Sequence, residues 1–157
     1  MNHIAIFVDV QNIYYTTRQS FGRQFDYRLF WQCVSELGEI KIANAYAIDR
    51  GDPQQQKFQA ALRHIGFDVK LKPYIQRIDG SSKGDWDVGL TIDALLSAEH
   101  VDEIILLSGD GDFDLLLQTL RDRYQVSSHL FSVADLTAKS LIESADRWTE
   151  IDEKLLL

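Results

Sequence analysis

The sequence has only one cysteine, Cys33, and only two prolines and nine glycines among its 157 residues. A single cysteine excludes an intramolecular disulfide and a cysteine zinc cluster. So little proline and glycine leaves little room for a long flexible linker. No apolar run approaches the roughly 18 residues that span a bilayer, and the N-terminus lacks the features of a signal peptide. We therefore expect a soluble cytoplasmic protein.

Acidic residues outnumber basic ones by 24 to 16, so the formal net charge is −8. This excess argues against a protein that coats nucleic acid through a uniformly basic surface. The charges are also unevenly distributed. Residues 41–83 include eight basic and four acidic residues, whereas residues 84–157 include five basic and sixteen acidic ones. Most of these side chains are expected on solvated faces, but the division also fits an acidic pocket beside a basic segment.

Apolar runs typical of buried strands alternate along the chain with amphipathic segments typical of helices. Strands are expected at residues 3–8, 40–48, 67–75, 103–107 and 126–131, and helices at 11–21, 27–37, 53–65, 87–98, 113–123 and 136–144, with a polar loop at 76–84. This alternation indicates right-handed βαβ crossovers and a parallel sheet covered on both faces. The sequence predicts one three-layer α/β/α domain at residues 1–150, with a mostly parallel sheet of about five strands, and a tail at 151–157.

Acidic residues stand at the carboxyl ends of two expected strands, where open parallel sheets bind their ligands. Asp9 follows the first strand, and Asp110 and Asp112 follow the fourth. Asp85 and Asp87 stand at the start of the helix expected at 87–98. If the first and fourth strands are neighbours, these acids converge. Each acid alone is explained as well by a helix cap, so the prediction depends on the joint pattern.

Several carboxylates packed together raise one another's pKa, and a hard divalent cation removes that cost. Oxygen ligands favour Mg²⁺ or Mn²⁺ over zinc, and one or two such ions would suit phosphate-ester chemistry. Asp85, Asp93 and Ser108 are candidates for supporting such a site, although Asp93 is equally well explained as a surface residue. A calcium loop at residues 110–114 is excluded, because Leu115 stands where that loop requires glycine.

Four segments, in order along the chain, resemble the NYN domain family. Residues 7–12 (FVDVQN) resemble its D-x-x-N opening, and residues 83–94 (KGDWDVGLTIDA) resemble its K-G-x-x-D-V-x-L-x-x-D-A stretch. Residues 107–113 (LSGDGDF) resemble its S-G-D-G-D-F signature, and residues 140–148 are similar to its closing segment. The resemblance covers nearly the whole chain and is greatest to the bacterial LabA-like (DUF88) branch.

This resemblance implies a PIN-like, Rossmann-like fold with an acidic metal pocket, in a family that includes metal-dependent ribonucleases. It assigns metal binding to four acids, Asp9, Asp87, Asp110 and Asp112. It also implies that Asn12 supports the site by hydrogen bonding. Because Asp85 lies so near Asp87, the sequence leaves open which of the two reaches the metal.

Together, the residues and the resemblance predict a Mg²⁺- or Mn²⁺-dependent endoribonuclease that acts on single-stranded or structured RNA. Its catalytic residues would be Asp9, Asn12, Asp87, Asp110 and Asp112, and its RNA-binding residues Arg50, Lys72, Arg77 and Lys83. Tyr14 and Tyr15 would either stack on a base or pack in the core. The alternative hypothesis is a non-catalytic RNA- or protein-binding regulatory module that keeps the acidic pocket and acts through protein partners or as a homo-oligomer. A phosphatase or nucleotide hydrolase is a third, less favoured hypothesis.

Overall fold

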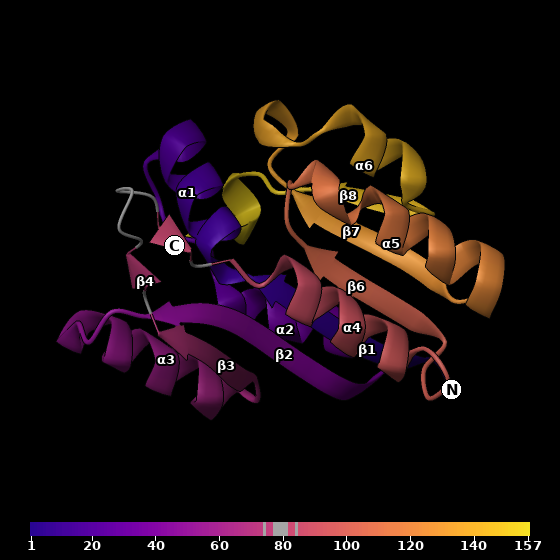
Figure 1. Ribbon diagram of the computed structural model, residues 1–157, viewed down its shortest axis with the longest axis horizontal. Coiled ribbons are helices and arrows are strands. Elements are labelled where there is room, and N and C mark those ends of the chain that lie inside the picture. The colour runs from indigo at the N-terminus through magenta and orange to yellow at the C-terminus, as the bar shows by residue number, and fades with distance from the viewer. Residues whose placement is uncertain (74, 77–81, 84) are drawn as a thin grey trace.

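The computed structural model describes residues 1–73, 75–76, 82–83 and 85–157. Within this part of the chain, six strands form one sheet in the order β3-β2-β1-β6-β7-β8 (Figure 1). They are β1 (His3–Asp9), β2 (Glu39–Asp49), β3 (Asp68–Pro73), β6 (Glu103–Leu107), β7 (Ser127–Ser132) and β8 (Arg147–Glu150). All five neighbouring pairs are parallel. The strand order reverses between β1 and β6, so this is the point at which such sheets bind ligands.

In the part of the chain that the structure describes, six α-helices cover this sheet, which confirms the predicted α/β class. They are α1 (Val10–Phe21), α2 (Tyr27–Ser35), α3 (Pro53–Ile65), α4 (Asp87–Ser97), α5 (Asp114–Thr119) and α6 (Lys139–Ser144). Aspartates begin the first three: Asp9, Asp26 and Asp52 each accept a hydrogen bond from a backbone N–H in the first turn of the helix that follows. Pro53 takes the first position of α3. A backbone N–H at this position would have no acceptor within the helix, so proline removes no hydrogen bond there.

Two hydrophobic cores lie on opposite faces of the sheet because side chains alternate along each strand. From β1, Ile4, Ile6 and Val8 point into a core shared with α1, α2 and α3. Ala5 and Phe7 point into the other core, which α4, α5 and α6 cover. Figure 1 shows α4, α5 and α6 together on one side of the sheet. The three layers that the sequence predicts are therefore confirmed.

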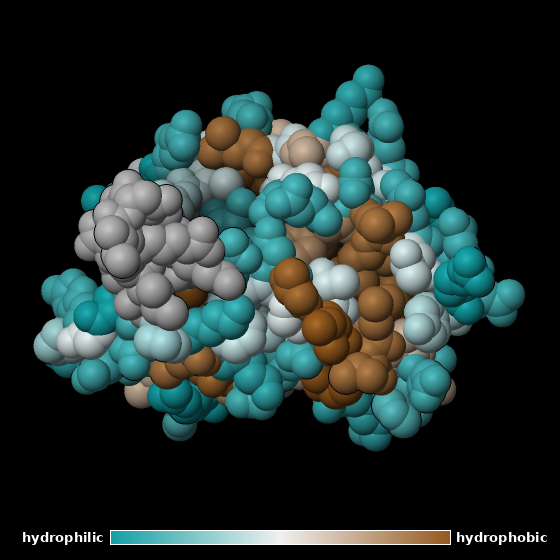
Figure 2. Space-filling view, viewed as in Figure 1, coloured by the Kyte–Doolittle hydropathy of each residue, from teal (hydrophilic) through white to brown (hydrophobic). Residues whose placement is uncertain are grey.

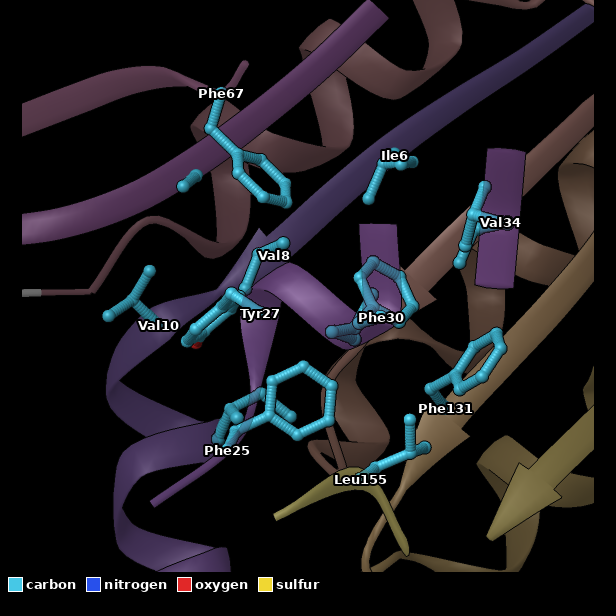
Figure 3. Packing of buried hydrophobic residues seen from close by; sticks show 14 of the residues in the cluster. Ile6, Val8, Val10, Phe25, Tyr27, Phe30, Val34, Phe67, Phe131 and Leu155 are labelled. Carbon is cyan, nitrogen blue, oxygen red and sulfur yellow. The ribbon is translucent and has the colours of Figure 1, made fainter. Parts of the chain in front are cut away.

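The first core is rich in aromatic rings (Figure 3). The Phe25 ring lies 4.8 Å from that of Tyr27 and 5.6 Å from that of Phe30, measured between ring centroids. Phe30 in turn meets Phe131 of β7 edge to face at 5.1 Å. Leu155, near the C-terminus, packs in the same cluster. These contacts bind α2 and the end of the chain to one face of the sheet.

Three residues of segment 151–157, which was expected as a tail, are packed in this core. Ile151 is buried, and Leu155 and Leu156 are almost fully buried. The short helix η4 (Glu153–Leu155) leads to an antiparallel bridge between Leu156 and Phe25. The N–H of Leu157 donates to the carbonyl oxygen of Gln24 at 2.8 Å. The last residues thus cover the region between α1 and α2.

Three segments differ from the sequence prediction. The structure has a sixth sheet strand, β8, between the last expected helix and residue 151, where no element was expected. It pairs with β7, and Trp148 Nε1 donates to Ser132 Oγ at 2.9 Å. Strand β3 ends at Pro73, and the polar loop contains a two-stranded antiparallel pair, β4 (Ile75–Gln76) and β5 (Ser82–Lys83). The single helix expected at 113–123 is divided into η1 (Gly111–Phe113), α5 and the π-helical turn η2 (Leu120–Tyr124).

Helix α4 buries one side and exposes an apolar stripe on the other. Leu90 is 1% exposed, whereas Val88, Ile92 and Leu96 are 71%, 50% and 68% exposed. Figure 2 shows brown side chains gathered over α4 and the neighbouring α5. Despite this apolar surface, none of the helices in the described residues combines the length and hydropathy of a membrane span.

Candidate metal centre

An acidic pocket of about 250 Å³ opens at the carboxyl ends of the strands, beside the point where strand order reverses. Among the described residues, four aspartates line it, namely Asp9, Asp85, Asp87 and Asp110. Its other lining residues are Gln11, Asn12, Tyr15, Tyr46, Ile48 and Trp86. The position agrees with the general rule for ligand binding in open α/β sheets.

Three of the carboxylates form a tight group. Asp9, Asp87 and Asp110 each offer an oxygen, and these oxygens all lie within 4.8 Å of one another. Asp9 ends β1, Asp110 follows the adjacent strand β6, and Asp87 is the first residue of α4. Because β1 and β6 are direct neighbours in the sheet, two acids separated by about a hundred residues meet at the carboxyl ends of these two strands. This spacing is small enough for one divalent cation to contact all three groups.

The other two predicted acids occupy different positions. Asp85 is exposed at the pocket wall, where its Oδ1 accepts a hydrogen bond from the N–H of Asp87 at 3.2 Å. Asp112 is exposed, and its backbone N–H donates to Asp110 Oδ1 at 2.9 Å. Among the residues that the structure describes, the close group includes Asp87 but neither Asp85 nor Asp112.

Ser108 and Asn12 fix the acids in place. Ser108 Oγ donates to Asp9 Oδ2 at 3.0 Å and accepts from the N–H of Asp110 at 3.1 Å, so it links the two carboxylate-bearing segments. The N–H of Asn12 donates to Asp9 Oδ1 at 3.3 Å. The side-chain Oδ1 of Asn12 accepts a hydrogen bond from the N–H of Gly109 at 2.8 Å. Asn12 therefore connects the start of α1 to the loop that carries Asp110.

The two glycines of the S-G-D-G-D-F segment let this loop pack closely against residues 136–138. A Cβ at Gly109 would lie 2.5 Å from the carbonyl oxygen of Leu136, and one at Gly111 would lie 2.8 Å from Cβ of Ala138. The N–H of Ala138 also donates to the carbonyl oxygen of Gly109 at 3.1 Å. A larger residue at either position would clash with residues 136–138, so the loop that carries Asp110 would have to shift.

Burial and mutual repulsion raise the pKa values of two of the grouped acids. Burial raises the pKa of Asp9 to about 6, aided by the charges of Asp110 and Asp85 and opposed by the hydrogen bonds from Asn12 and Ser108. Burial, followed by the charges of Asp110, Asp85 and Asp9, raises the pKa of Asp87 to about 7. Near neutral pH the group thus carries negative charge at an energetic cost that a bound cation would relieve.

Tyr46 and Trp86 form a wall of the pocket that the sequence prediction missed. Tyr46 donates its hydroxyl to Asp93 Oδ2 at 2.7 Å and accepts from Asn44 Nδ2 at 3.1 Å. Burial raises the pKa of the Tyr46 hydroxyl, so it stays protonated and can keep donating. Trp86 Nε1 donates to the carbonyl oxygen of Ala47 at 2.9 Å, and its ring lies 5.3 Å from that of Tyr46. In the sequence, nothing distinguishes Tyr46 from other core residues of a strand. Trp86, in contrast, lies inside the segment 83–94 that resembles the K-G-x-x-D-V stretch of the family, and this position is a signal that could have identified it.

Two of the four predicted RNA-binding residues are placed near the pocket. Lys72 Nζ lies 4.5 Å from the centroid of the Trp86 ring and donates to the carbonyl oxygen of Asp85 at 3.3 Å. Arg50 follows β2 and lines a neighbouring groove of about 890 Å³. Arg77 lies outside the described residues, and for Lys83 only the backbone, in β5, is described.

Comparison with known proteins gives one family and two relatives of nearly full length. The sequence model of the NYN domain matches residues 3–152. The low amplitude and bright protein LabA of Synechococcus elongatus is 31% identical over 160 residues, which cover 97% of this chain and 85% of LabA. The crystal structure of VPA0982, a protein of unknown function from Vibrio parahaemolyticus, matches with a TM-score of 0.95 and 50% identity over 99% of this chain and 96% of that chain. The matched range includes every residue of the acidic pocket.

Proposed function

This chain belongs to the NYN domain family, and we propose that it is a metal-dependent endoribonuclease. It would hydrolyse RNA phosphodiester bonds with Mg²⁺ or Mn²⁺ held by Asp9, Asp87 and Asp110. The observation that carries this proposal is the approach of three carboxylates to within 4.8 Å of one another at the edge of the sheet. Nucleases of this family typically use divalent metals, and three acidic oxygen donors suit such ions.

The residues of the pocket fit a hard divalent cation. All three donors in the group are carboxylate oxygens, and burial, together with the charges of neighbouring aspartates, raises the pKa values of Asp9 and Asp87. Bound Mg²⁺ or Mn²⁺ would polarise a phosphate oxygen and lower the pKa of an attacking water. We assign Asp112 a smaller role than the other predicted ligands, because its exposed carboxylate lies outside the close group.

The remaining residues would position the ligands and the substrate. Ser108 is hydrogen-bonded both to the Asp9 carboxylate and to the Asp110 N–H, and Asn12 connects α1 to the same loop by accepting from the Gly109 N–H. Lys72, placed over Trp86 beside the pocket, would contact the RNA backbone. A pocket of about 250 Å³ has room for a phosphodiester group rather than for a whole nucleotide chain. The adjoining surface must therefore bind the rest of the RNA.

The proposal is tested by incubating the purified protein with 5′-labelled single-stranded RNA in the presence of Mn²⁺, Mg²⁺ or EDTA. Cleavage should require the cation, and Asp110→Asn should reduce it by roughly 100-fold, which corresponds to a loss of about 3 kcal/mol of transition-state stabilisation. Asp122→Asn is the matched control, because Asp122 lies on the surface with its side chain 67% exposed. Equal cleavage by the Asp110 variant would indicate a contaminating nuclease and refute the assignment.

The non-catalytic module makes a different prediction in the same experiment. If the pocket only binds a cation, Mn²⁺ should raise the melting temperature of the native protein but not that of Asp110→Asn, and RNA should stay intact with both. That combination would contradict the ribonuclease proposal and favour the module.

A further inference from the structure

Four large apolar side chains are exposed together on the side of the molecule that α4 and α5 cover. Val88, Ile92 and Leu96 of α4 are 71%, 50% and 68% exposed, and Leu115 of α5 is 67% exposed. Figure 2 shows apolar side chains gathered over these two helices. Single exposed leucines are ordinary, but a contiguous apolar patch on a folded domain marks a surface that binds another macromolecule.

The exposed residues of α4 have the spacing of a helix-packing ridge. Val88, Ile92 and Leu96 are four residues apart, so they form one row that extends for about 12 Å along the helix. The core does not use this row, because α4 packs on the sheet through Leu90 and Ala94 on its other side. Rows of this spacing fit between the rows of a second helix. A helix is therefore the element that this ridge is shaped to bind.

The charge around the ridge is mostly negative. Residues 85–123, which include α4 and α5, have ten acidic side chains and two arginines. One of the arginines, Arg121, lies 3.5 Å from Asp122, which offsets its charge. Five of the acids stand at or just beyond the ends of the two helices, namely Asp85, Glu99, Asp112, Asp114 and Asp122. The ridge, Leu115 and these five acids make up the α4–α5 face.

From the ridge and the charge around it we propose that the α4–α5 face binds a basic amphipathic helix of a partner protein. The apolar residues of that helix would pack beside Val88, Ile92 and Leu96, and its lysines and arginines would lie against the surrounding acids. A second copy of this chain would bring the same acids against one another, and an anionic membrane would be repelled in the same way. None of the three ridge residues lines the acidic pocket, so this inference does not depend on the proposed ribonuclease function.

The experiment measures binding of a defined cationic helix. The probe is a fluorescein-labelled synthetic peptide of eighteen leucine and lysine residues, with the leucines spaced so that they form one face of a helix. It is titrated with the full chain and followed by anisotropy, once in EDTA and once with Mn²⁺. A scrambled peptide of the same composition, whose leucines are spread around the helix, is the control for charge alone. The amphipathic peptide should bind at least about 10-fold more tightly than the scrambled one, and Mn²⁺ should change its affinity by less than about 3-fold.

Substitutions on the ridge should weaken this binding because they remove apolar area from the contact. We expect a loss of about 5- to 10-fold for Leu96→Gln, and of at least about 30-fold when Ile92→Gln is added to it. Glutamine has nearly the helix propensity of leucine, so these exposed substitutions leave α4 intact. Leu157→Gln is the matched control, because Leu157 is 66% exposed but lies near α1 and α2 on the other side of the sheet. Glu99→Lys should weaken binding about 3-fold by reversing one charge of the face.

The other outcomes would each contradict the proposal. Equal binding of the scrambled peptide would show that charge alone is responsible, and a loss of more than about 10-fold with Mn²⁺ would place the peptide in the acidic pocket. If Leu96→Gln binds like the native protein, or Leu157→Gln loses as much affinity, the ridge is not the binding surface. A native dimer that the double variant converts to a monomer, measured by light scattering, would assign the face to a second copy. Binding to phosphatidylglycerol vesicles that the double variant loses would assign it to a membrane.

Discussion

Replacing Asp87 by asparagine should stabilise the metal-free protein at alkaline pH while weakening its response to divalent cations. Burial and the neighbouring aspartates raise the pKa of Asp87 from its usual 3.8 to about 7. In the unfolded chain the group would ionise near pH 4, so between pH 4 and pH 7 the folded state binds more protons than the unfolded state. Stability is therefore lost as pH rises through this window, and the loss is complete above pH 7.

The size of the effect follows from the shift in pKa. A change from 3.8 to about 7 would correspond to roughly 4 kcal/mol at 1.36 kcal/mol per pKa unit for a carboxyl fully withdrawn from water. Asp87 is only half-buried, and solvent screens exposed charges strongly, so we expect about 1–2 kcal/mol. Asparagine has almost the same shape and no charge. The variant should thus gain about 1–2 kcal/mol in free energy of unfolding at pH 8 and nothing at pH 4.

Urea unfolding followed by tryptophan fluorescence in EDTA measures this difference. The control is Glu99→Gln, which changes the net charge equally at an exposed position just beyond the end of α4 and should leave stability unchanged. With Mn²⁺ at 100 times its dissociation constant, the native protein should gain about 2.7 kcal/mol and the Asp87 variant much less. A loss of stability in Asp87→Asn at pH 8 in EDTA would refute the reasoning, as would an equal gain in Glu99→Gln.

Three further predictions concern other parts of the molecule. Asp112→Asn should retain RNA cleavage within about 10-fold of the native rate while Asp110→Asn loses roughly 100-fold, and equal losses in single-turnover assays would show that Asp112 belongs to the ligand group. Burial lowers the pKa of His129 to about 4, so stability should fall by about 2–3 kcal/mol as pH drops from 6.5 to 4, and in His129→Gln the acid side of the stability profile should be flatter. Leu90→Ala should cost about 2–5 kcal/mol in urea unfolding and Leu96→Ala under about 0.5 kcal/mol, because the first side chain is 1% exposed and the second 68%. Comparable costs would contradict the burial described for α4.

The fold could be predicted because its main signals are local in the sequence. The apolar runs at 3–8 and 103–107 are continuous, since both faces of these strands are covered, and they became β1 and β6. Strand β8 has no such signal. It is four residues long, and Trp148 is its only large apolar side chain. Its pairing with β7 and the hydrogen bond to Ser132 are contacts between distant segments, which periodicity does not detect.

The pocket was predictable only in part. The positions of Asp9 and Asp110 at strand ends follow from the sequence once β1 and β6 are neighbours. The choice between Asp85 and Asp87 does not, because it depends on which carboxylate comes within reach of Asp9 and Asp110 in the folded chain, and among the described residues Asp87 does so. The sequence also gives no reason to connect Asp93 with Tyr46. Their hydrogen bond joins α4 to β2 across 47 residues and sets the position of the pocket wall.

The helix-cap interpretation and the metal-ligand interpretation of these aspartates are compatible, and their combination explains how the fold tolerates the acidic group. Asp9 caps α1, Asp110 caps η1, and Asp87 occupies the first turn of α4. Each charge thus lies at the amino end of a helical segment, where unpaired backbone N–H groups favour an anion. The caps use Oδ1 of Asp9 and Oδ1 of Asp110, and Oδ2 of Asp9 also accepts from Ser108. Because each carboxylate oxygen has two lone pairs, an oxygen that accepts one hydrogen bond still has a lone pair for a cation. One aspartate after a strand is therefore uninformative about function, whereas three that share a pocket carry more negative charge than helix capping alone requires.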